Sequence, residues 1–526
     1  MVKCGIVGHL QRSAARTPER IALVDERRRW TYSQFAAAVT SCSAALVGLG
    51  LPRASRVAIY LDKSVEQAVA LYAAVGAGLI AVPVNPKLKP NQVGHILRDC
   101  GASALISTAY RLGDLTGQPG LDDLHRIVVR SGARPPGERS HAHRWEDLLA
   151  ESDDDAPLHE FMETDAALIL YTSGSTGHPK GVVLSHRNLA VGAESVNAYF
   201  RTTGADVLLA LLPFTFDAGL SQMTMAVAVG ARLVLHTFLR PQEVVALCER
   251  EQVTILVGVP PLWSQLASGS WGRSGASVRL IGNTGGHMSR TLLGRLRALF
   301  PNAQPYLMYG LTEAFRSSYL DPAQIDTRPD SVGKAMPNVE LMLVRPDGSP
   351  CEAGEEGELV HFGPLVALGY WNDAERTAER FRCVPNALSP GLLPRVGVWS
   401  GDLFRRDAQG YLYFVGRRDE MIKSSGYRIS PVEIEAVLHS APGVREAVIF
   451  GVADEEFGQM PVAAVVAQSP PLSVPDVLAY CRRMLPGYMV PRFIEVQELP
   501  RLSNGKIDRV AVRVEHSASL AARSAA

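Results

Sequence analysis

The sequence lacks long apolar runs, paired cysteines and an excess of charge of either sign. No apolar run approaches the roughly 18 residues that a membrane-spanning helix needs, and the N-terminus has no apolar segment followed by a small-residue cleavage site. The seven cysteines are scattered without a CxxC pair, which argues against a disulfide framework or a zinc site. Basic and acidic residues balance at 53 each, so there is no electrostatic reason to expect nucleic acid as a partner. We therefore expect a cytoplasmic protein with free thiols and no membrane span.

The remaining composition fits a globular enzyme of more than one domain. The 526 residues exceed what one ordinary hydrophobic core holds, and 47% hydrophobic with 20% charged residues does not fit a disordered chain. Thr31 and Gln34 form a capping-box pattern that opens a helix over 32–49. Further helices are expected over 64–78 and 90–100, and strands over 56–61, 80–84, 104–106, 206–212, 232–235 and 254–257. This alternation predicts an α/β fold built on doubly wound, largely parallel sheets.

The character of the sequence changes twice towards the C-terminus. Glycine and proline become more frequent over 338–370, where short alternating strands predict a small β-rich subdomain. A compact α+β unit follows from near Arg417. We expect an N-terminal domain over residues 1–416, a C-terminal domain over 417–512 and a disordered tail over 513–526.

The stretch YTSGSTGHPKG, residues 171–181, is the most informative of the chain. Apolar runs at 166–170 and 182–184 flank it and are typical of buried strands. A loop so rich in Gly, Ser and Thr brings backbone N–H groups and hydroxyls close together, and Lys180 adds a positive charge, as a polyphosphate requires. A flexible surface turn is the alternative, but the flanking strands and the lysine favour phosphate binding. Lys180 is followed by Gly181, so the loop is not of the Walker type.

Two later motifs carry carboxylates, and each has an ordinary structural alternative. In YGLTE, residues 309–313, Thr312 could bind a phosphate oxygen and Glu313 could hold Mg²⁺, or Glu313 could simply be a charge at a helix N-terminus. In SGD, residues 400–402, Asp402 could accept hydrogen bonds from both ribose hydroxyls, or it could cap a turn.

Two further motifs lie in the C-terminal part, and the order of all five is specific. A polar loop over 421–430 contains Gly426, and NGKIDR, residues 504–509, contains Lys506, for which a solvated turn lysine is the alternative. Together, from about residue 10 to 510, the motifs resemble those of the AMP-forming adenylating superfamily, which includes acyl-CoA synthetases, peptide-synthetase adenylation domains and beetle luciferases. The chain most resembles stand-alone exosortase-associated acyl ligases and enzymes that load amino acids onto free carrier proteins.

The resemblance implies a role for each matching residue. The β,γ-phosphates would be bound by the loop residues Thr172, Ser173, Gly174, Ser175, Thr176, Gly177 and Lys180. The rest of the ATP site would comprise Gly285, Gly286, Tyr309, Thr312, Asp402 and Arg417, with Glu313 holding the Mg²⁺. Lys506 would bridge the attacking carboxylate and the α-phosphate, and Lys506, Thr312 and Glu313 would be the catalytic residues. Asp419 would be the hinge of a mobile C-terminal domain, and Gly426 would line the tunnel for an incoming thiol.

The acid to be activated is expected to contact Asp217, Gly285 and Arg316. Asp217 lies in FTFDAG, which is similar to the FDxS motif of amino-acid adenylation domains, although the final serine is missing. A buried aspartate needs a compensating partner, so a substrate amine is one candidate, and a helix N-cap is the alternative role. Arg316 could face the same pocket or form a structural ion pair. If both face the pocket, a zwitterionic acid is expected; if neither does, a fatty or aryl acid is expected.

The thiol acceptor is expected to come from another molecule. Only 17 residues follow Arg509, too few for a carrier module, so we expect the phosphopantetheine thiol of a free carrier protein, with coenzyme A as the alternative. The expected reaction is therefore ATP- and Mg²⁺-dependent activation of a carboxylic acid as acyl-AMP, followed by thioester formation. An inactive nucleotide-binding homologue and a luciferase-like oxygenase are the other interpretations, and the intact Lys180, Glu313, Asp402 and Lys506 argue against the first.

Overall fold

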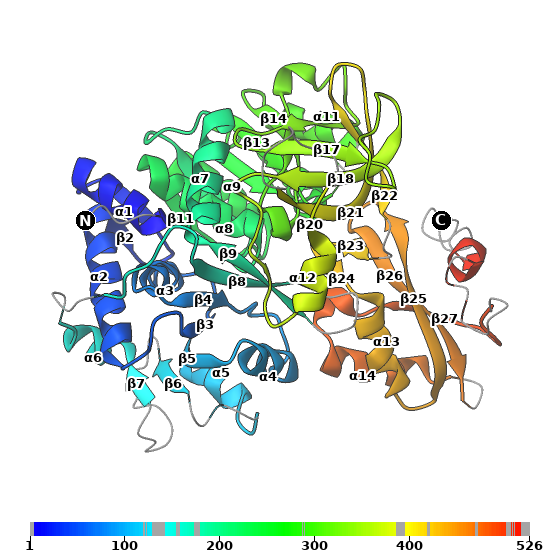
Figure 1. The fold of residues 1–526 in the computed structure, drawn as a ribbon, viewed down its shortest axis with the longest axis horizontal. Coiled ribbons are helices and arrows are strands. Elements are labelled where there is room, and N and C mark those ends of the chain that lie inside the picture. The colour runs from blue at the N-terminus through cyan, green and yellow to red at the C-terminus, as the bar shows by residue number, and fades with distance from the viewer. Residues whose placement is uncertain are drawn as a thin grey trace.

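The computed structural model describes residues 5–118, 121, 124–128, 142–153, 158–172, 179–286, 288, 290–384, 395–417, 421–468, 472–500, 507, 509 and 511–516. Within these residues the strands form three sheets (Figure 1). The two large sheets belong to the part of the chain coloured blue to yellow, and the small third sheet to the orange C-terminal part. Among the described helices, none is both long and apolar enough to cross a membrane.

The first sheet is mostly parallel and contains both flanks of the loop at 171–181. Its strand order is β19-β9-β8-β4-β3-β5-β6-β7. The strands are β3 (Arg56–Tyr60), β4 (Ile80–Pro83), β5 (Ala102–Ser107), β6 (His125–Val128), β7 (Ala142–Arg144), β8 (Ala166–Thr172), β9 (Lys180–Ser185) and β19 (Gly369–Tyr370). The two apolar runs predicted as strands are β8 and β9, which pair antiparallel with Thr172 opposite Lys180. The two ends of the loop are therefore held next to each other.

The second sheet is the largest and changes from parallel to antiparallel along its length. Its order is β17-β18-β21-β22-β16-β15-β14-β13-β12-β10-β11-β1-β2, with β20 paired to β21. The strands are β1 (Ile21–Val24), β2 (Arg29–Thr31), β10 (Val207–Ala210), β11 (Arg232–Leu235), β12 (Ile255–Gly258), β13 (Leu280–Asn283), β14 (Gln304–Tyr309), β15 (Ser318–Leu320), β16 (Ser331–Ala335), β17 (Glu340–Val344), β18 (Glu356–Phe362), β20 (Phe381–Cys383), β21 (Val396–Arg406) and β22 (Leu412–Arg417).

In the part of the sheet that runs β1-β11-β10-β12-β13-β14, neighbouring strands are parallel, as the alternation with helices predicts. At its edge β2 pairs antiparallel with β1. From β14 onwards the pairs are antiparallel, because no long helix intervenes to carry the chain back across the sheet. The α/β fold class is confirmed. The segment predicted as β-rich, 338–370, contributes β17 and β18 to this same sheet, with apolar clusters of its own on their faces.

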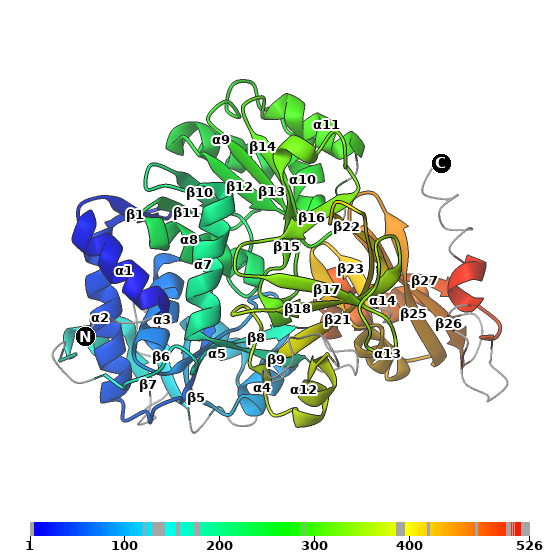
Figure 2. The same cartoon turned by 45° about the horizontal axis from the view of Figure 1, so that its top comes forward.

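The helices connect the parallel strands and pack between and outside the two large sheets. They are α1 (Gly5–Arg16), α2 (Tyr32–Gly48), α3 (Val65–Gly76), α4 (Pro90–Asp99), α5 (Ala109–Asp114), α6 (Trp145–Ala150), α7 (His186–Phe200), α8 (Asp217–Val229), α9 (Pro241–Glu251), α10 (Pro260–Ala267), α11 (Arg290–Leu299), η1 (Thr312–Ala314), η2 (Pro322–Gln324) and α12 (Ala374–Arg380). Helix α2 begins with the predicted capping box of Thr31 and Gln34. Helices α1, α2, α3 and α7 lie side by side (Figure 2). One continuous apolar core includes residues of these helices and of both sheets.

The C-terminal part folds around its own sheet and its own cores. Its elements are β23 (Ile422–Ser424), β24 (Tyr427–Ile429), α13 (Pro431–His439), β25 (Val444–Asp454), β26 (Gly458–Ala467), α14 (Val474–Met484), η3 (Gly487–Met489) and β27 (Arg492–Glu495). Residues 511–516 are helical and Val512 packs on one of these cores, so the described chain stays ordered past residue 513, where a disordered tail is predicted. Residues 418–420 and 517–526 lie outside the described ranges, and the domain boundary at 416/417 stays a prediction.

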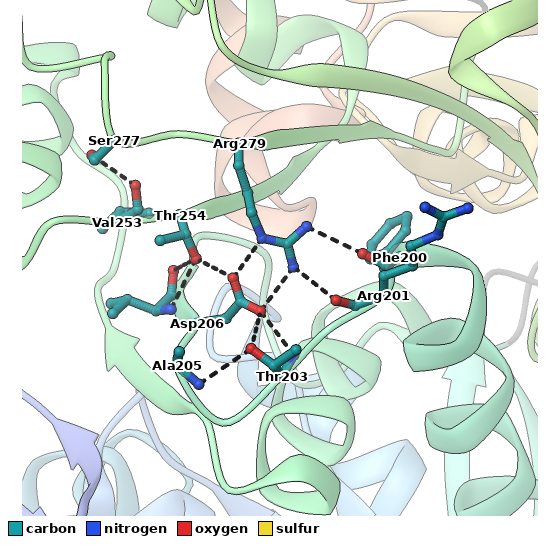
Figure 3. Close-up of polar contacts among 10 residues, drawn as sticks. Phe200, Arg201, Thr203, Ala205, Asp206, Val253, Thr254, Ser277 and Arg279 are labelled. Atoms are coloured by element: carbon teal, nitrogen blue, oxygen red, sulfur yellow. Dashed lines mark hydrogen bonds and ion pairs between the residues drawn. The ribbon is translucent and has the colours of Figure 1, made fainter.

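A partly buried ionic cluster joins three parallel strands at their amino-terminal ends (Figure 3). Asp206 accepts hydrogen bonds from Arg279 Nε at 2.7 Å and Nη2 at 2.8 Å, and from Thr254 Oγ1 at 2.8 Å. Burial raises the pKa of Asp206, but these donors outweigh it, so that the pKa lies below its usual value. Because the three residues directly precede β10, β13 and β12, the cluster fixes the alignment of the strands whose opposite ends form the site described next.

Candidate active site

A cavity of about 870 Å³ opens at the carboxyl ends of the parallel strands of the large sheet. Its lining includes residues that directly follow these strands: Leu211 to Ala218 after β10, Thr237 to Leu239 after β11, Val259 after β12, Thr284 and Gly285 after β13, and Gly310 to Thr312 after β14. Ligands of open α/β sheets bind in the crevice outside the carboxyl ends of the strands. Residues of the C-terminal part, among them Gly426 and Tyr488, complete the wall.

Lys180 and Glu313, predicted to bind phosphate and metal, lie in direct contact. Lys180 Nζ donates a hydrogen bond to Glu313 Oε1 at 2.9 Å and another to the hydroxyl of Tyr370 at 2.8 Å. The Tyr370 hydroxyl in turn donates to Glu313 Oε1 at 2.8 Å. The three residues come from β9, η1 and β19, and β9 and β19 are paired strands. A cation and an anion are thus held together beside the end of the loop.

A strained turn places Glu313 at the end of β14. Phe315 follows the short helix η1 and has a φ of +53°, which is uncommon for a residue with a side chain. Its ring is fully buried and packs against Gly192 of α7, where an added Cβ would lie 2.6 Å from the ring. The buried ring therefore holds the turn, and with it Thr312 towards the cavity and Glu313 towards Lys180.

Tyr309 and Asp402, predicted to lie at the adenine and the ribose, are also in contact. The Tyr309 hydroxyl donates a hydrogen bond to Asp402 Oδ2 at 2.6 Å, and both side chains are buried apart from the face of Asp402 that lines the cavity. Asp402 lies within β21 opposite Arg417 of β22. The backbone of Arg417 is therefore next to Asp402, while its side chain lies outside the described part of the structure.

The predicted substrate residues separate into lining and supporting positions. Asp217 is the first residue of α8 and lines the cavity, as does Gly285. The N-cap of α8 is Phe216, so Asp217 is not the N-cap residue that the alternative interpretation requires. Its carboxylate nevertheless accepts a hydrogen bond from Ala218 N at 2.7 Å. Burial raises the pKa of Asp217, and the positive charge of Arg316 partly opposes the shift.

Arg316 is not among the residues that line the cavity, although it is buried close to it. Its Nη1 donates a hydrogen bond to Thr284 Oγ1 at 3.2 Å, and Thr284 does line the cavity. Arg316 thus supports the wall and supplies charge to Asp217 from behind it. A zwitterionic acid is expected if both side chains face the cavity. Asp217 faces it and Arg316 does not, so the condition is half met.

The C-terminal part closes the cavity with the loop that contains Gly426. Gly426 has a φ of +81°, and a Cβ added there would lie 3.0 Å from Val259, which also lies 3.2 Å from a Cβ added at Gly285. Next to it, the ring of Tyr427 contacts that of Phe216 at a centroid distance of 4.8 Å and stacks on Tyr488 at 3.6 Å. The predicted thiol-tunnel residue therefore lies on the cavity.

Several predicted residues lie outside the described part of the chain: Ser173, Gly174, Ser175, Thr176, Gly177, Asp419 and Lys506. The structure describes other predicted nucleotide-site residues, which line the cavity or lie next to residues that line it: Thr172, Lys180, Gly285, Gly286, Tyr309, Thr312, Glu313 and Asp402. The roles of all these residues stay predictions. The sequence motifs assign no role to Tyr370, which lies in the stretch GYWND, residues 369–373. They also assign none to Thr284, Gln92 and Glu433, for which patterns in a single sequence carry no signal.

Known families and proteins resemble the chain over nearly its whole length. The AMP-binding enzyme family matches residues 10–371, and the AMP-binding enzyme C-terminal domain matches residues 433–506. Feruloyl-CoA synthase of Amycolatopsis sp is 30% identical over 511 residues, with 95% of this chain and 97% of that protein covered. L-proline–[L-prolyl-carrier protein] ligase of Pseudomonas fluorescens is 29% identical over 514 residues, with 96% and 97% covered.

Among solved structures, one enzyme in two ligand states resembles the chain to different degrees. A double mutant of o-succinylbenzoate CoA synthetase from Bacillus subtilis, bound with its product analogue, gives a TM-score of 0.81 at 27% identity, covering 96% of this chain and 97% of that one. The same enzyme in complex with AMP gives a TM-score of 0.68 at 27% identity, covering 96% and 98%. The fold of the present chain, taken as a whole, thus resembles the product-analogue complex more than the AMP complex.

Proposed function

Because the chain belongs to the AMP-binding enzyme family, whose members are ATP-dependent ligases that form acyl-adenylates, we propose that it activates an amino or β-amino acid and transfers it to a phosphopantetheine thiol. One observation carries the proposal. A single cavity is bordered by Thr312 and Asp402, by Asp217, and by Gly426 from the C-terminal part. Nucleotide, acid and thiol would meet there.

In the first half-reaction the acid carboxylate attacks the α-phosphorus of ATP, and the bond to pyrophosphate breaks. Asp402, oriented by Tyr309, would hold the ribose hydroxyls, and Thr312 would contact the α-phosphate. Lys180 would bind the departing phosphates, exchanging its contact with Glu313 for phosphate oxygens. Lys506 would offset the repulsion between the two anionic reactants and align them.

One carboxylate beside a phosphate-binding lysine suits Mg²⁺, which favours one or two carboxylates together with nucleotide phosphates. Glu313 would hold the ion, and the ion would neutralise charge on the phosphates. Tyr370 would keep the Glu313 carboxylate oriented through its hydrogen bond of 2.8 Å.

Asp217 supports an acid that carries an amine. A carboxylate inside a cavity is costly unless a cation accompanies it, and Arg316 supplies only part of that compensation from behind the wall. A substrate ammonium would supply the rest. A pyrophosphate-exchange screen of amino, β-amino, fatty and aryl acids tests this: amino acids should be preferred, and Asp217→Ala should lose the preference. An unchanged selectivity in that variant would refute the role of Asp217.

A free carrier protein is the proposed source of the thiol, and coenzyme A is the second candidate. The similarity to a prolyl-carrier protein ligase supports the first, and the exposed Lys87 at the cavity favours the second, since a cation there could bind a coenzyme A phosphate. Transfer from a preformed acyl-adenylate to phosphopantetheinylated carrier protein should proceed faster than transfer to coenzyme A at equal concentration. A preference for coenzyme A would select the alternative.

We infer that the C-terminal part takes one orientation for adenylation and another for thiol transfer. The similarity to the product-analogue complex supports the second of these for the structure described here. In the orientation described here Gly426 faces the cavity, and a turn of the C-terminal part about Asp419 would bring Lys506 there instead. Lys506→Ala should therefore lose adenylation but still transfer acyl groups from preformed acyl-adenylate. Equal loss of both half-reactions would contradict the two-orientation cycle.

A further inference from the structure

Gln92 of α4 and Glu433 of α13 meet across the junction between the N-terminal and C-terminal parts. Gln92 Nε2 donates a hydrogen bond to Glu433 Oε1 at 2.9 Å, and the two residues are 341 positions apart in the chain. Both line the same cavity as Gly426. The contact can exist only when α13 lies against α4.

The direction of this hydrogen bond is fixed from the N-terminal side. Gln92 is the third residue of α4, and its Oε1 accepts a hydrogen bond at 3.0 Å from the backbone N–H of Lys89, the N-cap residue of the helix. The carbonyl end of the amide is therefore occupied, and only its NH₂ group is left to face α13. Gln92 is presented as a donor, and Glu433 must accept.

We propose that Gln92 and Glu433 are a positioning pair that selects the orientation of the C-terminal part in which Gly426 faces the cavity, and so favours thiol transfer over adenylation. This inference rests on the two-orientation cycle proposed above. In that cycle neither Gln92 nor Glu433 touches the reacting atoms. The pair acts by holding α13, and with it the β23–β24 loop, against the N-terminal part.

Burial in the docked orientation favours the neutral form of the Glu433 carboxyl group. Burial in the junction raises the pKa of Glu433 to about 7, while the hydrogen bond from Gln92 lowers it in part. The titratable neighbours Tyr427 and Tyr488 are neutral, since burial raises the pKa of both. The other charged residues that line the same cavity are Lys63, Lys87, Lys423, Arg111, Asp62, Asp217 and Asp402. When the C-terminal part turns away, Glu433 regains water and its pKa returns towards 4.5.

The sign of the pH dependence follows from these two values. The docked orientation has the higher pKa and binds more protons, so it is favoured below pH 7 and is progressively lost as the pH rises through about 7. Between pH 6 and 8.5 the docking equilibrium should fall about tenfold at most, because pH 6 lies only about one unit below the docked pKa of about 7 and the dependence ends above that pKa.

Glu433→Gln tests the pair, because glutamine keeps an acceptor for Gln92 and has no charge to lose. Single-turnover transfer from preformed acyl-adenylate to phosphopantetheine is measured from pH 6 to 8.5 in both proteins. Ionisation of the thiol affects both alike, so the ratio of the wild-type rate to the variant rate isolates Glu433. We expect that ratio to fall up to tenfold with rising pH, and to stay constant for the matched control Glu498→Gln, an exposed position of the same part of the chain.

Gln92→Ala gives an independent result. It should slow thiol transfer several-fold and leave pyrophosphate exchange unchanged or slightly faster, because only the docked orientation loses a contact. A flat ratio for Glu433→Gln, or a Gln92→Ala defect of equal size in both half-reactions, would overturn the pair. Energy transfer between one dye on each part reports docking without catalysis. If no acid supports pyrophosphate exchange, the proposed function fails, and the pH titration of that signal in wild-type and Glu433→Gln protein still decides the positioning pair.

Discussion

Tyr309 donates a hydrogen bond of 2.6 Å to Asp402 and so joins the end of β14 to β21 beside the cavity. Phe at position 309 would keep the ring, which packs on Phe404, and would remove only this bond. A hydrogen bond to a charged group contributes about 1.5–3 kcal/mol. We expect Tyr309→Phe to raise the KM for ATP about tenfold, since about 1.4 kcal/mol corresponds to a factor of ten.

Steady-state pyrophosphate exchange with varied ATP measures this effect. The KM for the acid serves as the internal control and should change little, because Tyr309 is not among the described residues that line the cavity. A rise in both KM values would show that the substitution deforms the site as a whole.

The cluster of Lys180, Glu313 and Tyr370 predicts a graded pair of variants. Glu313→Gln removes the negative charge that accompanies Lys180 and should lower the pyrophosphate-exchange rate roughly 100-fold or more. Tyr370→Phe leaves that charge in place and removes a hydrogen bond, so a loss of about tenfold or less is expected. Comparable losses in the two variants would argue that orientation by Tyr370, and not charge at Glu313, is what the site requires.

The environment of Asp217 predicts a pH dependence of acid binding. Burial raises the pKa of Asp217, with Arg316 opposing the shift only in part, so its neutral form is populated at a higher pH than for an ordinary aspartate. If its carboxylate holds a substrate ammonium, the KM for that acid should rise as the pH falls through this raised pKa. Asp217→Asn should have a high KM without this pH dependence. An amine-free acid, the matched control, should show none in either protein.

The positive φ of Gly426 and its contact with Val259 predict a defect confined to thiol transfer. Gly426→Ala places a Cβ about 3.0 Å from Val259 in a backbone conformation that costs about 1 kcal/mol or more for alanine. Transfer from preformed acyl-adenylate should slow tenfold or more, while pyrophosphate exchange stays within twofold of wild type. Adding Val259→Ala should restore part of the rate by relieving the close contact. Lack of any rescue would assign the whole defect to the backbone.

The sequence predicts local structure well where a single segment determines it. The strand expected at 232–235 is β11 with the same bounds, and the helix expected at 90–100 is α4, one residue shorter. Periodicity and caps act over a few residues, and both can be recognised without the rest of the chain. The antiparallel half of the large sheet was not predicted, because it depends on which distant strands pair.

The candidate site was likewise predictable only where its residues lie in local motifs. Lys180, Glu313 and Asp402 lie in recognisable motifs, whereas the contact of Lys180 with Tyr370 joins residues 190 positions apart and that of Gln92 with Glu433 joins residues 341 apart. No pattern in one sequence reports such a distance. The position of Arg316 behind the cavity wall also follows from the turn at Phe315, whose positive φ no local rule for phenylalanine would suggest.

The ionic cluster around Asp206 lies at the amino-terminal ends of β10, β12 and β13, and the cavity lies at their carboxyl ends. The groups that fix the strands are therefore a full strand length away from the loops that contact substrate. A change of the loops at 211–218 or 237–239 can alter which acid is accepted without loosening the frame that carries them. The same separation makes these loops the rational place to diversify the chain for new acids, with Asp206 and Arg279 held constant.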